Sequence, residues 1–159
     1  MTNNKGFIKK TNARLAAVQA VYSYLITGED MDAVKHAFLT GQTGGFVLIE
    51  EDGIKEFFEK LPAYDHDFFS TLIDFFVEHE KQINVSVISS LSENWSEERL
   101  ETLLKAIMLM GTTELFAFPQ TDVKIIMNEY IDIAKSFYDG TEPKMVNAIL
   151  EKIAKVIRE

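Results

Sequence analysis

Cysteine is absent from this 159-residue chain, and residues that break helices are scarce. The lack of cysteine excludes disulfides, thiolate metal sites and cysteine nucleophiles. Only 3 prolines and 8 glycines occur, mostly between stretches of helical periodicity. No apolar run approaches the length of a membrane span, and the polar, basic start is not followed by the apolar core of a secretory signal. These absences predict a helical, cytoplasmic protein with no membrane segment.

Acidic residues outnumber basic ones, but the N-terminal part of the chain is basic. The net charge is −9, yet residues 1–28 contain four basic residues and no acidic one. The other 131 residues carry 12 basic and 25 acidic side chains. Because salt screens surface charges over about 8 Å, a local basic patch can bind phosphate on an acidic protein. From charge alone, an idle basic tail is the simpler interpretation.

Apolar residues recur at helical spacing in the first half of the chain. A first helix is predicted from Thr11 or Asn12 to Gly28, which leaves residues 1–10 as a flexible basic N-terminus. A short second helix follows Asp30 or Asp32. Residues 40–53 are the least helical stretch and are predicted to be a long connection.

The second half of the chain has stronger helical patterns. Asp65 is the predicted cap of a third helix, Ser96 of a later one, and Thr121 or Asp122 of the next. The final helix starts near Pro143, while residues 84–94 fit either a loop or a short helix. The chain is therefore predicted to be all-α: one domain over residues 1–159, a compact bundle of about seven helices.

Sequence motifs for catalysis are missing. There is no glycine-rich phosphate loop, nucleophile elbow or HExxH motif. The triplets Asp65-His66-Asp67 and Glu78-His79-Glu80 place their carboxylates next to the histidine, whereas helical metal ligands are spaced by three or four residues. The sequence therefore predicts no enzymatic activity and no metal site.

Three segments stand in one order along the chain: residues 13–22 (ARLAAVQAVY), 95–100 (WSEERL) with 105–107 and 111–115, and 123–137 (VKIIMNEYIDIAKSF) with 144–154 (KMVNAILEKIA). Together these three segments resemble the NusB family. The first resembles that family's ARxxAVQALY opening helix. The second resembles its W-x-x-x-R-L motif followed by RAILRLGAYEL, and the third its KVxINEAIELAKxF and KFVNGVLDKIA motifs.

The resemblance implies a fold with two helical subdomains and a function without a cofactor. Members of this family recognise boxA RNA on ribosomal RNA transcripts, as a heterodimer with the ribosomal protein NusE. They join other Nus factors and RNA polymerase in an antitermination complex. A similar domain begins certain ribosomal RNA methyltransferases, but this chain has no room for the methyltransferase domain.

The resemblance also implies RNA-binding residues. Arg14 is the first choice for a phosphate contact; Lys9 and Lys10 lie where the family carries an arginine run. Because lysine lacks the bidentate fork of arginine, weaker RNA binding by this chain alone is expected. Met145 replaces a phenylalanine of the family. The predicted RNA-binding set is Lys9, Lys10, Arg14, Gln19, Phe137, Thr141, Lys144 and Met145.

Simple structural roles compete with these assignments. Phe137 also fits packing on a core stripe, and Lys144 a solvated first-turn lysine. Tyr22, Leu104 and Lys105 are the predicted contacts to the protein partner, and the acidic remainder is expected to face basic NusE. Three polar residues of the third segment are interpreted as structural: Asn128, Glu129 and Asn147. The alternative function is a protein-only helical scaffold or homodimer with little RNA binding.

Overall fold

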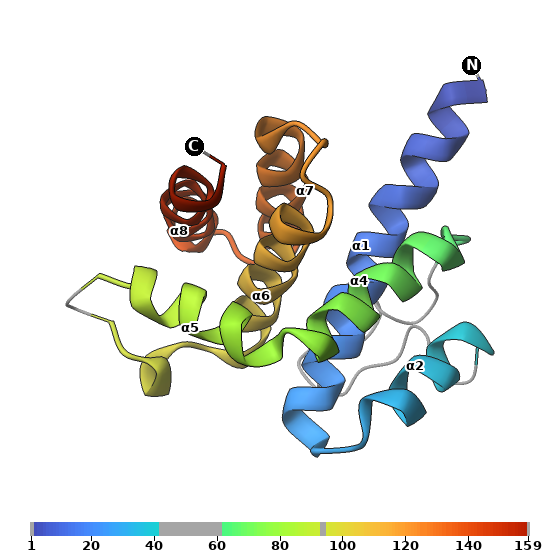
Figure 1. The fold of residues 1–159 in the computed structure, drawn as a ribbon, viewed down its shortest axis with the longest axis horizontal. Helices are drawn as coiled ribbons and strands as arrows, with labels where there is room; N and C mark the ends of the chain where they lie inside the picture. The colour runs from blue at the N-terminus through green and yellow to red at the C-terminus, as the bar shows by residue number, and fades with distance from the viewer. Residues whose placement is uncertain (1, 42–61, 93–94, 159) are drawn as a thin grey trace. The chain divides into compact units, whose positions relative to one another are not determined.

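The computed structural model describes residues 2–41, 62–92 and 95–158, and most of this part of the chain is helical (Figure 1). It forms two compact units, residues 1–74 and 75–159, whose boundary falls within α4. Within the described residues there are seven α-helices and no strand, which confirms the all-α prediction. The helices are α1 (Thr2–Thr27), α2 (Met31–Leu39), α4 (His66–Glu78), α5 (Glu80–Ser90), α6 (Thr102–Ala117), α7 (Val123–Phe137) and α8 (Glu142–Ile157).

Helices α1 and α2 and the start of α4 form the first unit. The aromatic rings of Phe38 and Phe69 stack with centroids 6.0 Å apart, and the hydroxyl of Tyr64 donates to the Phe38 carbonyl at 2.9 Å. The Asn12 amide donates to the Ala63 carbonyl at 2.9 Å, so α1 is tied to the segment that leads into α4. Burial of the phenol raises the pKa of Tyr64.

Helices α6, α7 and α8 pack on one another in the second unit, and α5 lies against α6 and α8. Every residue of α6 from Ala106 to Leu115 is buried. Gly111 marks the closest approach, because a Cβ there would lie 2.9 Å from Leu150 Cδ1 and 3.4 Å from Tyr130 Cγ. The buried Tyr130 hydroxyl donates to Glu114 Oε1 at 2.8 Å, which satisfies both polar groups inside the core.

Several helix starts agree with their predicted caps. Asp65 Oδ1 accepts from the Phe68 amide at 2.9 Å, and Asp122 Oδ1 accepts from the Lys124 amide at 3.0 Å. Asp30 is the N-cap residue of α2, and Pro143 lies in the first turn of α8. Residues 84–90 belong to α5, so the ambiguous segment is helical up to Ser90.

Two predicted starts are wrong. Helix α1 begins at Thr2, so residues 2–10 are helical rather than a tail before a cap at Thr11 or Asn12. Ser96 precedes only a single 3₁₀ turn, Glu97–Arg99, and α6 starts at Thr102 after an extended Leu100. The predicted connection over residues 40–53 lies outside the described residues from position 42 onward. None of the described helices is both long and apolar enough to cross a membrane.

Candidate nucleic-acid interface

Basic side chains on α1 meet the ring of Phe68. The Lys10 ammonium lies 5.5 Å from the ring centroid, and the Arg14 guanidinium carbon lies 5.0 Å from it. Both distances fit cation–π contacts. Arg14 is only 4% exposed, whereas Lys9 and Lys10 are exposed. An incoming phosphate therefore meets the two lysines before it meets Arg14.

Gln19 and Tyr22 lie further along α1. Gln19 is 3% exposed, and neither its amide nitrogen nor its amide oxygen has a hydrogen-bond partner within the part of the chain that the structure describes. Tyr22 is half-buried. Of the α1 residues in the predicted set, only the two lysines present their charged groups on the surface.

Three predicted residues from different segments line one pocket of the second unit. Leu104, Thr141 and Met145 surround a cavity of about 210 Å³ that we call the Trp95 pocket. Trp95 is 40% exposed, and the guanidinium carbon of Arg99 lies 5.6 Å from its ring centroid. The complete lining is Trp95, Arg99, Glu101, Leu104, Tyr138, Thr141, Glu142 and Met145.

Carboxylates supply the acceptors of the Trp95 pocket. The Tyr138 hydroxyl donates to Glu101 Oε1, which holds two lining side chains together. Glu142 Oε1 is buried and has no hydrogen-bond partner among the described residues. A buried acceptor of this kind is costly unless a donor reaches it. The pocket therefore offers an aromatic ring and a guanidinium to a planar ligand, with two carboxylates in its lining.

Phe137 and Lys144 flank the residues of the Trp95 pocket in sequence. Phe137 is half-buried at the end of α7. Lys144 is exposed in the first turn of α8, and Thr141 is the N-cap residue of that helix. The positive end of a helix favours anions, so phosphate would be favoured beside Lys144.

Lys105, predicted to contact the protein partner, makes an ion pair within the chain. Its ammonium lies 2.6 Å from Glu97 Oε2. The hydrogen bond and the charge of Lys105 lower the pKa of Glu97. Lys105 is 16% exposed at its side chain and Leu104 is 3% exposed, so neither offers a large free surface.

The rings of two histidines pack on aromatic side chains. The ring of His79 packs on Phe75 with centroids 4.3 Å apart, and that of His66 on Tyr64 at 4.8 Å. Among the described residues, no group of three or more histidine, aspartate or glutamate side chains could hold a metal ion.

Asn128 and Asn147, interpreted as structural, are both exposed and line a groove between α7 and α8. Because both residues are exposed, burial does not support the structural interpretation for either of them.

The sequence analysis missed Trp95 and Arg99 as ligand-binding candidates. The available signal was local: the chain's single tryptophan stands in a polar segment, four residues before an arginine. Glu101 and Glu142 left no signal in the sequence, because their part in the pocket depends on how α6 meets the start of α8.

Comparison with known proteins decides the family. The model of the NusB family matches residues 11–155 of this chain. The chain belongs to the NusB family. A NusB transcription antitermination protein of Bartonella henselae is 36% identical over 150 residues, covering 94% of this chain and 89% of its own. That of Brucella suis is 37% identical over 153 residues, covering 94% and 82%.

Solved NusB structures share the fold. NusB of T. maritima superposes with a TM-score of 0.66 at 24% identity, over 91% of this chain and 89% of the other. A crystal structure of the antitermination factors NusB and NusE in complex with dsRNA superposes with a TM-score of 0.69 at 20% identity, over 92% and 96%. At these identities the superpositions establish the common NusB fold.

Proposed function

We propose that this protein is a transcription antitermination factor that binds boxA RNA as a heterodimer with NusE. It joins RNA polymerase and other Nus factors on ribosomal RNA operons in the cytoplasm, and it acts by assembly rather than catalysis. Family membership supports the process, because relatives at 36% and 37% identity are antitermination proteins. A NusB of the same fold has been crystallised with NusE and RNA.

The observation that carries RNA binding is the Trp95 pocket. Unpaired RNA bases are recognised by stacking on aromatic and arginine side chains and by hydrogen bonds to their edges. Trp95 and Arg99 supply the stacking surface, and the carboxyl groups of Glu101 and Glu142 belong to the same lining. Carboxylates accept from base amino groups such as cytosine N4. The pocket therefore suits one extruded base with an exocyclic amino group.

Phosphate contacts come from lysines in this proposal. Lys9 and Lys10 are exposed on α1, and Lys144 is exposed at the start of α8. Each neutralised phosphate releases counterions, so binding weakens as salt rises, with a slope that follows the number of contacts. Arg14, buried against Phe68, acts first by holding α1 and α4 in place.

A charge-reversal experiment tests the lysine contacts. The double change Lys9→Glu and Lys10→Glu is expected to weaken boxA RNA binding by more than tenfold and to reduce the salt slope by about two. Lys81→Glu, at an exposed position of α5, is the matched control and should leave binding nearly unchanged. Unchanged RNA binding in the double variant would instead favour the second candidate function.

The second candidate is a protein-only helical scaffold or homodimer. The burial of Arg14 favours it, because the one arginine among the predicted RNA-binding residues is not on the surface. Partner contacts would then involve Tyr22 and the acidic faces of the helices. Binding of NusE with no measurable RNA binding, alone or in the heterodimer, would establish this candidate in place of the first.

A further inference from the structure

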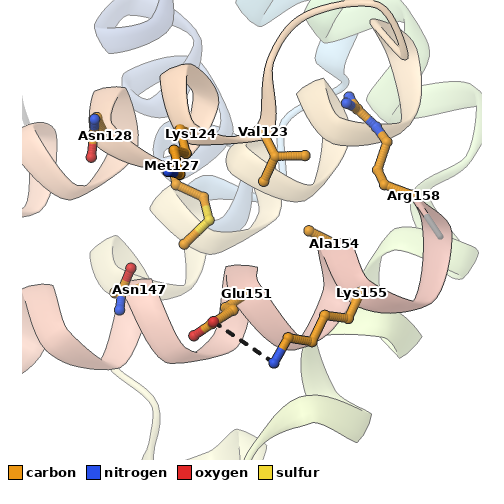
Figure 2. Close-up of a pocket in the computed structure, with 9 residues that line it drawn as sticks. All are labelled: Val123, Lys124, Met127, Asn128, Asn147, Glu151, Ala154, Lys155 and Arg158. Atoms are coloured by element: carbon orange, nitrogen blue, oxygen red, sulfur yellow. Dashed lines mark ion pairs between the residues drawn. The ribbon is translucent and has the colours of Figure 1, made fainter.

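A second and larger groove lies between α7 and α8, and it shares no lining residue with the Trp95 pocket. Its volume is about 540 Å³, and Figure 2 shows side chains from both helices along its walls. Lys124 and Asn128 lie one turn apart on α7, and Asn147 belongs to α8. We call this cleft the α7–α8 groove.

The polar side chains of the α7–α8 groove are available to a ligand. Lys124, Asn128 and Asn147 are exposed. An asparagine amide offers two donors and one acceptor. Two such amides on opposite walls match the alternating N–H and C=O groups of an extended peptide. Met127 and the buried Ala154 give the groove an apolar component between these polar walls.

The charge of the α7–α8 groove is opposite to that of the protein. Among the described residues that line the groove, Lys124, Lys155 and Arg158 are basic and only Glu151 is acidic, whereas the whole chain has a net charge of −9. Glu151 lies 3.8 Å from the Lys155 ammonium, as the dashed line in Figure 2 marks. Arg158 contributes its charge but not its donors, because its guanidinium already donates to three backbone carbonyls.

We propose that the α7–α8 groove binds an extended acidic peptide segment of a partner protein. Lys124 and Lys155 pair with the carboxylates of the segment, Asn128 and Asn147 bond its backbone, and Met127 packs on an apolar side chain between them. Nucleic acid fits less well, since the described residues that line the groove include no aromatic ring for base stacking and the guanidinium of Arg158 is occupied. This binding is separate from RNA binding in the Trp95 pocket.

Titration of the ¹⁵N-labelled full chain with a short peptide of alternating glutamate and leucine tests the proposal. The side-chain amide signals of Asn128 and Asn147 are expected to shift, while a peptide of alternating lysine and leucine leaves them in place. Lys124→Glu and Asn147→Ala are each expected to weaken peptide affinity by about tenfold, the effect of one lost charge-assisted or well-formed hydrogen bond. Lys135→Glu, exposed on the same helix but outside the groove, is the matched control.

Other outcomes would overturn the proposal. Shifts of these amide signals with an oligouridine probe but not with the acidic peptide would assign the groove to nucleic acid. An acidic peptide that binds the Lys124→Glu variant as well as the unchanged chain would place its site elsewhere. Because boxA RNA binding is measured on its own, failure here leaves the proposed antitermination function untouched.

Discussion

Lysine and arginine on α1 contact the same ring but have different access to solvent. Lys10 lies over Phe68 and remains exposed, whereas Arg14, one turn later, is 4% exposed. The sequence could predict the basic character of this helix from composition. It could not predict which basic group is buried, because that depends on Phe68, which is more than fifty positions away. Burial therefore makes Lys10, rather than Arg14, the first candidate for a phosphate contact.

Removal of Lys105 should raise the pKa of Glu97. In the folded chain the ammonium of Lys105 lowers the pKa of this carboxyl from its ordinary value of 4.5. Because the folded-state pKa is lower than that of the unfolded chain, the ion pair stabilises the fold at neutral pH. This contribution is lost as the pH falls through the folded-state pKa, below 4.5. Carboxyl chemical shifts in a pH titration should show the rise in Lys105→Ala, and an unchanged Glu97 pKa would contradict the ion pair.

Arg158 is expected to contribute to stability through the fork of its guanidinium. It donates to the carbonyls of Leu115, Phe118 and Thr121, and so satisfies groups at the end of α6 and in the loop after it. Arg158→Gln should lower the free energy of unfolding by about 2 kcal/mol. Arg158→Lys keeps the charge but not the fork and should lose most of the same amount. Urea unfolding measures both variants; full stability in the lysine variant would mean that charge alone suffices.

Local capping made some helices predictable, and tertiary packing decided the others. Asp65 and Asp122 each accept a hydrogen bond from a backbone amide of the following turn, so a rule about neighbouring residues located these starts. Ser96, with glutamates after it, has the same local signal, yet the helix breaks at Leu100. Leu100 is extended and 6% exposed. Burial of Leu100 competes with continuation of the helix, and the neighbouring residues in the sequence do not indicate this burial.

Gly111 is expected to tolerate no side chain, because α6 and α8 approach closely there. An added Cβ would lie 2.9 Å from Leu150 Cδ1, and Leu150 is fully buried. The gain in helix propensity of about 1 kcal/mol is smaller than the cost of overpacking, about 1–3 kcal/mol. Gly111→Ala should therefore reduce stability in thermal unfolding. Gly6→Ala is the control, since nothing lies within 4 Å of its added Cβ, and it should be neutral or stabilising. Equal effects of the two changes would contradict close packing at Gly111.

At the scale of the whole molecule, the sequence motifs identified the family but predicted the candidate site only in part. Leu104 was predicted as a partner contact and Thr141 and Met145 as RNA contacts, and the structure brings the three together around one pocket. Trp95, Arg99 and Glu142 complete that pocket but could not be chosen from the sequence, since a pocket requires segments forty residues apart to meet. The basic residues of α1 belong to the other unit. RNA binding by this chain is thus expected to depend on few cations and to gain strongly from a basic partner.

The most direct test of the proposed function is fluorescence anisotropy of boxA RNA and a scrambled RNA, each with and without purified NusE. Binding should be weak for the chain alone. It should strengthen at least tenfold for boxA RNA with NusE, with clear preference over the scrambled sequence, and Trp95→Ala should reduce that preference by about tenfold. Equal binding of both RNAs with NusE present, or no binding at all, would contradict sequence-specific RNA recognition by this protein.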